Sequence, residues 1–236
     1  MKINLKKLFI TLLVIQLVFF ALHMIFRTGM IESRDIYELA SFFSADLENS
    51  LPTWYSVVVL LFGSALLLFY IGWCKKKAGA KYYKNWIGLG AIFVFLSIDD
   101  SAMFHERLGA LNRVIGLQPV LDGINPYVFA WSWWVIFLPA FMFIGIFFIK
   151  WFFDLPNRTK ALFVASAFLL LLGQVGGEML SSYLTHSTGE YPIALRGVTK
   201  LIGKGFGFSL FLWSIVDYIH RYMPAKERRP IKIETE

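Results

Sequence analysis

A cluster of residues that could do acid–base or metal chemistry lies at residues 97–107, which read Ser-Ile-Asp-Asp-Ser-Ala-Met-Phe-His-Glu-Arg. The run before it, residues 86–96, carries no charged side chain. An α-helix needs about 20 residues to cross the hydrocarbon core, so a helix through this run brings the charges into the bilayer. A lone Asp at the centre of a membrane helix costs roughly 2.5–3.5 kcal/mol. We therefore expect Asp99 and Asp100 to have an ion-pair partner, a polar cavity or a chemical function.

The chemistry that these residue types allow is proton transfer or metal binding. Imidazole and carboxylate groups serve as general acids and bases, and they also bind zinc. The candidate catalytic residues are Asp99, His105, Glu106 and Glu178. The candidate metal ligands are Asp99, His105 and Glu178, with zinc or another divalent ion as the candidate cofactor. The candidate substrate-binding residues are Asp100, Ser101, Lys200 and Lys204. A lysine has the right charge to orient an anionic group, such as the phosphate of a lipid headgroup.

The elements that must position these residues are membrane helices. The chain has 236 residues, of which 57% are hydrophobic and 18% aromatic, a composition that excludes an ordinary soluble domain. Apolar runs of membrane-spanning length lie at residues 8–26, 54–73, 86–106, 127–150, 160–183 and 200–220. The sequence therefore predicts an all-α fold, an integral membrane bundle of six transmembrane helices that forms a single domain over residues 1–236.

The distribution of basic residues predicts how the bundle is oriented. Residues 1–7, 74–85, 150–160 and 221–236 hold 16 of the 23 Lys and Arg. The positive-inside rule assigns these segments to the cytoplasm, so both termini are predicted to be cytoplasmic, with residues 225–236 as a charged tail. This bias accounts for the formal charge of +7. We therefore expect the partner to be the lipid bilayer and not a nucleic acid.

The charged residues of three predicted spans should lie at one depth. Asp99, Glu178 and Lys204 each lie within about one or two helical turns of a predicted outer boundary. We expect an outward-opening intramembrane pocket in which Lys204 pairs with Glu178 or Asp99. The patterns Gly173-x3-Gly177 and Gly203-x3-Gly207 predict a close approach of helices beside it. Ion pairs that only join neighbouring helices are the alternative interpretation.

Two stretches, Glu48-Asn49-Ser50-Leu51-Pro52-Thr53-Trp54-Tyr55-Ser56 and Asp99-Asp100-Ser101-Ala102-Met103-Phe104-His105-Glu106, resemble an uncharacterised bacterial family of multi-pass inner-membrane proteins. In that family a Leu-Pro-Thr-Trp run opens the second span, and an acidic pair, four residues and then His-Glu close the third. The resemblance implies a bacterial inner (plasma) membrane and supplies no activity. This chain has Asp100 where the family has Glu, and bases at Lys200 and Lys204 where the family has acids.

A second, partial resemblance concerns Ser101-x3-His105, which is similar to a motif of the alkaline ceramidase superfamily. In those membrane hydrolases Ser, His and Asp surround an intramembrane zinc, so the resemblance implies a metal-dependent hydrolase. The superfamily also has a His-x3-His pair on a late span and usually seven spans. This chain has histidines at positions 23, 105, 186 and 220, without such a pair.

Three functions fit the pattern. The favoured one is a lipid-directed hydrolase or transferase, in one version metal-dependent, that acts on a lipid or lipid-linked anionic substrate at the outer leaflet. The first alternative is a proton- or ion-coupled transporter or permease, although the polar layer stops in the outer half of the predicted spans. The further alternative is a structural or accessory membrane subunit whose ion pairs set the order of the helices.

Overall fold

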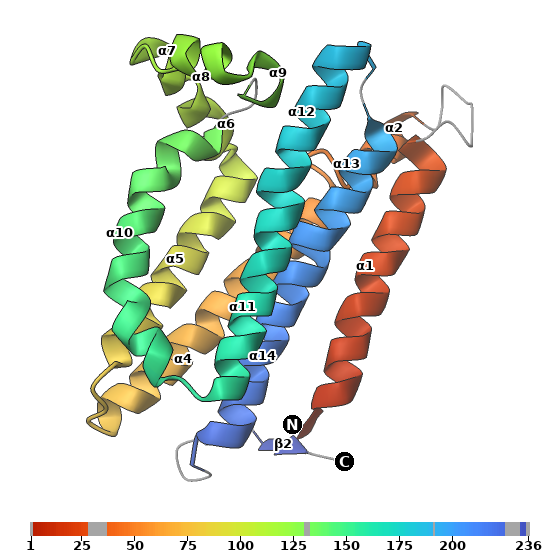
Figure 1. Ribbon diagram of the computed structural model, residues 1–236. Helices are drawn as coiled ribbons and strands as arrows, with labels where there is room; N and C mark the ends of the chain where they lie inside the picture. The colour runs from red at the N-terminus through yellow and green to blue at the C-terminus, as the bar shows by residue number, and fades with distance from the viewer. Residues whose placement is uncertain (1, 28–36, 130–132, 191, 225–231, 235–236) are drawn as a thin grey trace.

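The computed structural model describes residues 2–27, 37–129, 133–190, 192–224 and 232–234. In this part of the chain the fold is all-helical apart from one pair of three-residue strands, and long helical rods run side by side (Figure 1). The rods are α1 (Leu5–Arg27), α3–η2–α4 (Leu51–Tyr55, Ser56–Phe62, Gly63–Lys77), α5 (Tyr83–Ala102), α10 (Trp133–Asp154), α11–η3–α12 (Asn157–Leu171, Leu172–Gly176, Gly177–Thr188) and α13–η4–α14 (Ile193–Lys200, Leu201–Gly207, Phe208–Tyr222). The short connecting helices are α2 (Tyr37–Phe42), α6 (Phe104–Gly109), α7 (Leu111–Val114), α8 (Gln118–Ile124) and α9 (Pro126–Phe129).

Several of these rods have the length and composition of membrane spans. Within the described residues, four helical stretches are long and apolar enough to cross a bilayer, namely Leu5–Phe26, Leu51–Lys77, Phe137–Asp154 and Asn157–Thr188. These stretches give the chain the character of a membrane protein. The remaining two rods, α5 and α13–η4–α14, carry the acidic pair Asp99–Asp100 and the lysines Lys200 and Lys204. The six-span count and the orientation stay predictions.

Both ends of the chain lie at the same end of the bundle. The strand β1 (Lys2–Asn4) pairs in parallel with β2 (Lys232–Glu234), with Lys2 opposite Lys232. Figure 1 shows this pair at the end away from α2 and α6–α9. The predicted charged tail therefore includes a short strand, while residues 225–231 of that tail lie outside the described part of the chain.

The third rod ends earlier than the sequence predicted. α5 stops at Ala102, Met103 adopts a left-handed conformation with φ of 53°, and α6 starts at Phe104. The Asp99 carboxylate accepts the backbone N–H of His105 at 2.8 Å, which stabilises the corner in place of a continuing helix. The predicted continuous helix over residues 86–106 is therefore interrupted at Met103. The predicted span 127–150 overlaps α9 and α10, and residues 130–132 between them lie outside the described part of the chain.

The half of the bundle nearer the chain ends is packed and apolar. Leu68 and Ile71 of α4 and Ile215 of α14 are fully buried. Gly72 lets α5 approach α4 closely, since a Cβ there would lie 3.1 Å from the backbone nitrogen of Ile87. This close packing leaves the opposite half of the bundle as the region where polar groups are grouped and hollows form.

Candidate functional site

A continuous network of alternating charges joins four segments of the bundle. Its members, in order of contact, are Asp100, Lys204, Glu48, Lys200, Glu178, Arg196 and Asp46. They come from α5, from α13–η4, from α12 and from the connector between α2 and α3. None of these side chains is more than 13% exposed. Buried charges of this kind are stable only when paired, and here each acid has a basic neighbour.

The basic members of the network share one helix face. Arg196, Lys200 and Lys204 recur every four residues along α13–η4, the spacing that places side chains above one another. Lys204 Nζ lies 2.5 Å from Asp100 Oδ1 and 2.7 Å from Glu48 Oε2. Lys200 Nζ lies 3.4 Å from the other oxygen of Glu48 and 3.7 Å from Glu178 Oε1. Glu48 therefore bridges the two lysines.

Arg196 joins the last two acids of the network, Glu178 and Asp46. Arg196 donates from Nη1 to Glu178 Oε2, and its Nε donates to Asp46 Oδ1 at 2.7 Å. The planar guanidinium group suits this double role because it presents donors in several fixed directions. Arg196 thus holds the connector against α12.

Glu48 lies in the connector, outside the predicted spans, and its environment favours the charged form. Burial works against ionisation of this carboxyl, but Lys204 and Lys200 outweigh burial and lower its pKa to about 2. Glu48 is therefore an ionised acid at neutral pH that holds both lysines in place.

An Asp–His dyad stands beside the network. His105 Nδ1 lies 3.1 Å from Asp99 Oδ2, while the other oxygen of Asp99 accepts the backbone N–H of His105. Asp99 therefore fixes both the backbone and the imidazole ring of His105. A carboxylate hydrogen-bonded to one ring nitrogen of a histidine orients the ring and favours one tautomer.

The dyad and the network meet at one end of a cavity of about 370 Å³. Its polar lining consists of Glu48, Asp99, Asp100, His105, Gln174, Glu178, Lys200 and Lys204. Its apolar lining consists of Leu61, Phe95, Leu96, Phe137, Phe141, Ala167, Leu170, Leu171, Val175 and Phe208. The cavity therefore has a charged part and a larger apolar part, as a site for an amphipathic molecule requires.

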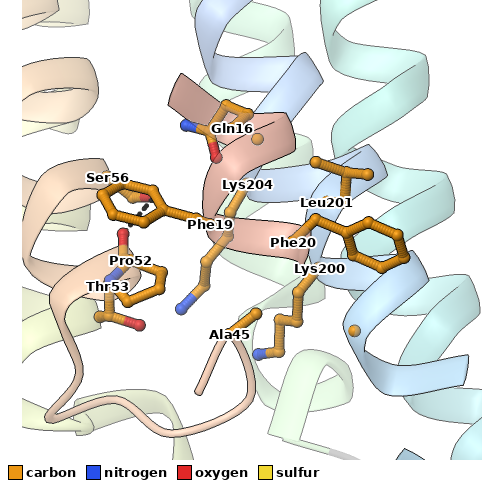
Figure 2. Close-up of a pocket in the computed structure, with 12 residues that line it drawn as sticks. Gln16, Phe19, Phe20, Ala45, Pro52, Thr53, Ser56, Lys200, Leu201 and Lys204 are labelled. Atoms are coloured by element: carbon orange, nitrogen blue, oxygen red, sulfur yellow. Dashed lines mark hydrogen bonds between the residues drawn. The ribbon is translucent and has the colours of Figure 1, made fainter. Parts of the chain in front are cut away.

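A second, much smaller hollow lies on the other side of the two lysines. It has a volume of about 20 Å³, enough for roughly one water molecule. Figure 2 shows Lys200 and Lys204 in this hollow together with Gln16 and Phe19 of α1, Ala45 and Thr53. Lys200 and Lys204 line both hollows.

Most of the predicted site residues converge on the cavity, and two do not contribute to its described lining. Those that line it are Asp99, Asp100, His105, Glu178, Lys200 and Lys204. Ser101 is exposed and lines a different hollow with Trp54 and Phe42, because it projects from the other side of α5. Glu106 lies in α6, and its side chain is outside the described part of the structure.

The predicted partners of Lys204 are wrong. Its ammonium group pairs with Asp100 and Glu48, whereas Glu178 pairs with Lys200 and Arg196 and Asp99 binds His105. The expectation that acids of the third and fifth rods meet bases of the sixth is nevertheless confirmed. The glycine patterns also pack as predicted, since a Cβ on Gly203 would lie 3.1 Å from Gly173 Cα.

The candidate metal ligands are not gathered into a metal site. Among the described residues, no three His, Cys, Asp or Glu side chains lie close enough to hold a metal ion. Both oxygens of Glu178 face cations, and Asp99 is bound to His105 within the corner. These residues therefore do not fit the zinc site that the sequence suggested, and no chemical step is assigned to a metal.

Three members of the network, Asp46, Glu48 and Arg196, were not among the predicted site residues. They lie in connectors or at a helix start, where charge is ordinary and gives no signal by itself. Glu48 did stand at the head of the Glu48–Ser56 stretch that carries the family resemblance, which was the one indication of its role. Its place beside Lys204 depends on a contact between residues 156 positions apart, which the local sequence cannot show.

Comparison with known proteins places the chain in a family without assigning it an activity. The model of a domain of unknown function, DUF8692, matches residues 8–215, a stretch that contains the whole charge network and the Asp99–His105 dyad. No curated protein and no solved structure matches the chain. The match covers most of the sequence, and the chain therefore belongs to the DUF8692 family.

Proposed function

We propose that the protein is a lipid-directed hydrolase or transferase whose substrate lies in the 370 Å³ cavity with its headgroup at the charged end. In this proposal all six rods span a bacterial inner membrane and both termini are cytoplasmic, so the cavity is in the outer half of the bilayer. The pairing of β1 with β2 supports a common side for the two termini. Six spans, an even number, also place the two termini on the same side of the membrane.

The observation that carries the proposal is the position of the Asp99–His105 dyad at the polar end of an otherwise apolar cavity. A volume of about 370 Å³ lies in the range of ligand sites, roughly 300–1,000 Å³. Phe95, Phe137 and Phe141 supply an apolar wall along which an acyl or isoprenoid chain can lie. An enzyme that acts on lipids requires a general base next to an apolar cavity that holds the lipid tail.

The proposed mechanism uses His105 as a general base. Asp99 holds Nδ1–H, so Nε2 can take a proton from water in a hydrolysis or from an acceptor hydroxyl in a transfer. The oxygen that loses this proton attacks the substrate, and the imidazolium returns the proton to the leaving group. Asp99 stabilises the transient imidazolium and keeps the ring oriented.

The test is turnover of membrane lipids by the purified protein. Wild type in detergent is incubated with a bacterial lipid extract, and mass spectrometry follows substrate loss and product formation. His105→Ala should lower the rate by about 10²–10⁴-fold, the usual contribution of a general base. Asp99→Asn should also lower the rate while keeping a group that can cap the corner.

His186→Ala provides the matched control, because His186 is exposed on α12 and does not line the cavity. This variant should retain the wild-type rate. Equal rates in His105→Ala and His186→Ala, with both proteins folded by circular dichroism, would exclude His105 as the base.

Transport is the second candidate, and one observation favours it. Lys200 and Lys204 line two hollows, so in this proposal movement of these ion pairs exposes the polar groups to each hollow in turn. Proteoliposomes with an internal pH-sensitive dye would report the coupled proton movement that a transporter requires. Flux in these vesicles without lipid turnover would replace the enzymatic proposal.

A further inference from the structure

Two arginines share one buried carboxylate at the end of the bundle where α14 finishes (Figure 1). The carboxylate belongs to Asp217 of α14, which is 1% exposed. Arg158 of α11 donates from Nε to Asp217 Oδ2 at 2.9 Å. Arg221 of α14 donates from Nε to Asp217 Oδ1 at 2.8 Å. Asp217 therefore orients both guanidinium groups and holds them close to each other.

The two arginines retain hydrogen-bond donors for a further ligand. Each contacts Asp217 through Nε, and neither makes another hydrogen bond or ion pair with the described residues. Their side chains are 43% and 48% exposed, so a ligand can reach them from outside the bundle. Asp154, the acid closest to Arg158 in sequence, is exposed and makes no ion pair in the described part of the chain. Two guanidinium groups on one carboxylate leave one positive charge, and their remaining N–H donors match the oxygens of a phosphate.

Further positive charge lies next to this pair. Arg158 Cζ lies 5.6 Å from the centroid of the Trp213 ring, and Trp213 Nε1 donates to the carbonyl oxygen of Leu5 at 3.2 Å. The start of α1 is therefore adjacent, and Lys6 and Lys7 are exposed there. Guanidinium and ammonium groups gathered at one place attract an anion.

An exposed apolar stripe of α11 leads away from Arg158. Residues at intervals of three or four from Arg158 share its helix face. The exposed members of this stripe are Ala161, Ala165, Phe168 and Leu172. They belong to one of the helical stretches that are long and apolar enough to cross a bilayer. A phospholipid bound at the arginines can lay its acyl chains on this stripe, whereas a free phosphate cannot use it.

We infer that Arg158 and Arg221 bind the phosphate of a phospholipid with a net negative charge. None of the residues of this site lines the 370 Å³ cavity, so the inference is independent of the proposed lipid chemistry. A zwitterionic phospholipid has the same phosphate but also carries an ammonium group, which the net positive charge of the site repels. In the predicted orientation the site faces the cytoplasmic leaflet, opposite to the leaflet that supplies the cavity.

The experiment measures lipid binding to the full-length protein in detergent by native mass spectrometry. The probes are dioleoyl phosphatidylglycerol, which is anionic, and dioleoyl phosphatidylcholine, which has the same tails and no net charge. We expect phosphatidylglycerol to bind at least about fivefold more tightly. Equal affinities of the two lipids would overturn the inference.

Paired substitutions separate this site from general attraction to a basic surface. Arg158→Gln combined with Arg221→Gln should lower the preference for phosphatidylglycerol by at least about threefold. Lys81→Gln combined with Lys84→Gln is the matched control, because it also removes two positive charges, from exposed positions between the second and third rods. The control should keep the wild-type preference. An equal loss in both double variants would overturn the inference, since it would show attraction without a defined site.

Two further measurements cover the folding of the variants and the source of the phosphate. The double arginine variant leaves the buried Asp217 without its partners, whereas Arg221→Gln alone keeps Arg158 on Asp217. This single variant should lower the preference by at least about twofold, and an unchanged preference would contradict the site. Sodium phosphate should displace no more phosphatidylglycerol than sodium chloride does at the same ionic strength. Selective displacement by phosphate would assign the arginines to a free anion and overturn the lipid inference.

Discussion

At the scale of single residues, Glu48 connects the lysines that line the cavity. Each of its carboxylate oxygens faces a different lysine, and the side chain is 9% exposed. Removing one partner of a buried ion pair costs about 3–5 kcal/mol because the other charges stay buried without compensation. Glu48→Gln should therefore destabilise the protein far more than a change at an exposed acid such as Glu190.

The pKa of Glu48 also predicts a pH dependence of stability. Burial alone would raise this pKa, but Lys204 and Lys200 lower it from 4.5 to about 2 in the folded protein. A lowered folded-state pKa means that the stabilisation is fully present above about pH 4.5 and is lost as the pH falls toward about 2. The melting temperature of wild type in detergent should therefore be lower at about pH 3 than at about pH 7.

Glu48→Gln should have a lower melting temperature than wild type at about pH 7 and a smaller change on acidification, since it lacks this titrating group. Glu190→Gln is the control, because Glu190 is exposed, and its free energy of unfolding should stay within about 0.5 kcal/mol of wild type. The same acid sensitivity in Glu48→Gln as in wild type would show that other carboxylates cause the pH dependence.

Residue chemistry predicted which charges needed partners but not the partners themselves. An acid inside an apolar run must be compensated, and Asp99, Asp100 and Glu178 all are. The compensation of Lys204 comes partly from Glu48, which reaches it because the connector after α2 folds back into the bundle. His23 of α1 holds this connector by accepting the backbone N–H of Ala45 at 3.1 Å. Contacts of this kind depend on the path of a loop, which no local pattern encodes.

At the scale of elements, three π-helical segments lie next to the cavity. They are η2, η3 and η4, and each contributes to the cavity lining through Leu61, Gln174 and Lys204 respectively. A π-helical turn contains an extra residue, so it changes the direction in which the following side chains point. The predicted pairing of Lys204 with Glu178 assumed regular helices. The wide turns at η3 and η4 are one physical reason why the actual partners differ.

The contact between η3 and η4 predicts the effect of a small substitution. A Cβ on Gly173 would overlap the backbone of Gly203 and the carbonyl oxygen of Thr199. Gly173→Ala must therefore push the two rods apart, which should cost about 1–3 kcal/mol and displace Lys204 from Asp100. Gly145→Ala in α10 is the matched control, since a Cβ there has no atom within 4 Å. That variant should be neutral or slightly stabilising, as Ala favours helix more than Gly does.

Thermal unfolding in detergent measures both alanine variants against wild type. If Gly173→Ala is as stable as Gly145→Ala and turns over the lipid extract at the wild-type rate, the close packing of η3 on η4 is not what positions the lysines. Loss of stability without any change in lipid turnover would confine the role of Gly173 to packing.

At the scale of the whole molecule, hydrophobic length predicts the rods well. Each predicted span overlaps a long helical rod, because about 20 apolar residues need a helix to satisfy their backbone in lipid. The end of α5 was missed because a polar side chain, Asp99, competes there with the helix backbone. The fold was thus largely predictable, whereas the site was predictable only in the types of residue that it contains.

The six-span topology makes a final prediction about which residues face each side of the membrane. In a Cys74→Ser background, single cysteines replace Lys81, between the second and third rods, Asp122 in α8, and Glu190, after α12; all three positions are exposed. A membrane-impermeant maleimide should label positions 122 and 190 in intact cells and position 81 only after permeabilisation. The reason is that α5 crosses the bilayer between positions 81 and 122.

Labelling of positions 81 and 122 from the same side would mean that α5 does not span the membrane. Labelling of position 81 alone in intact cells would mean that the bundle is inverted. The cavity would then draw its lipids from the cytoplasmic leaflet, since the polar groups lie at the end of the rods away from β1 and β2. The side of the membrane from which the substrate enters therefore follows directly from the labelling pattern.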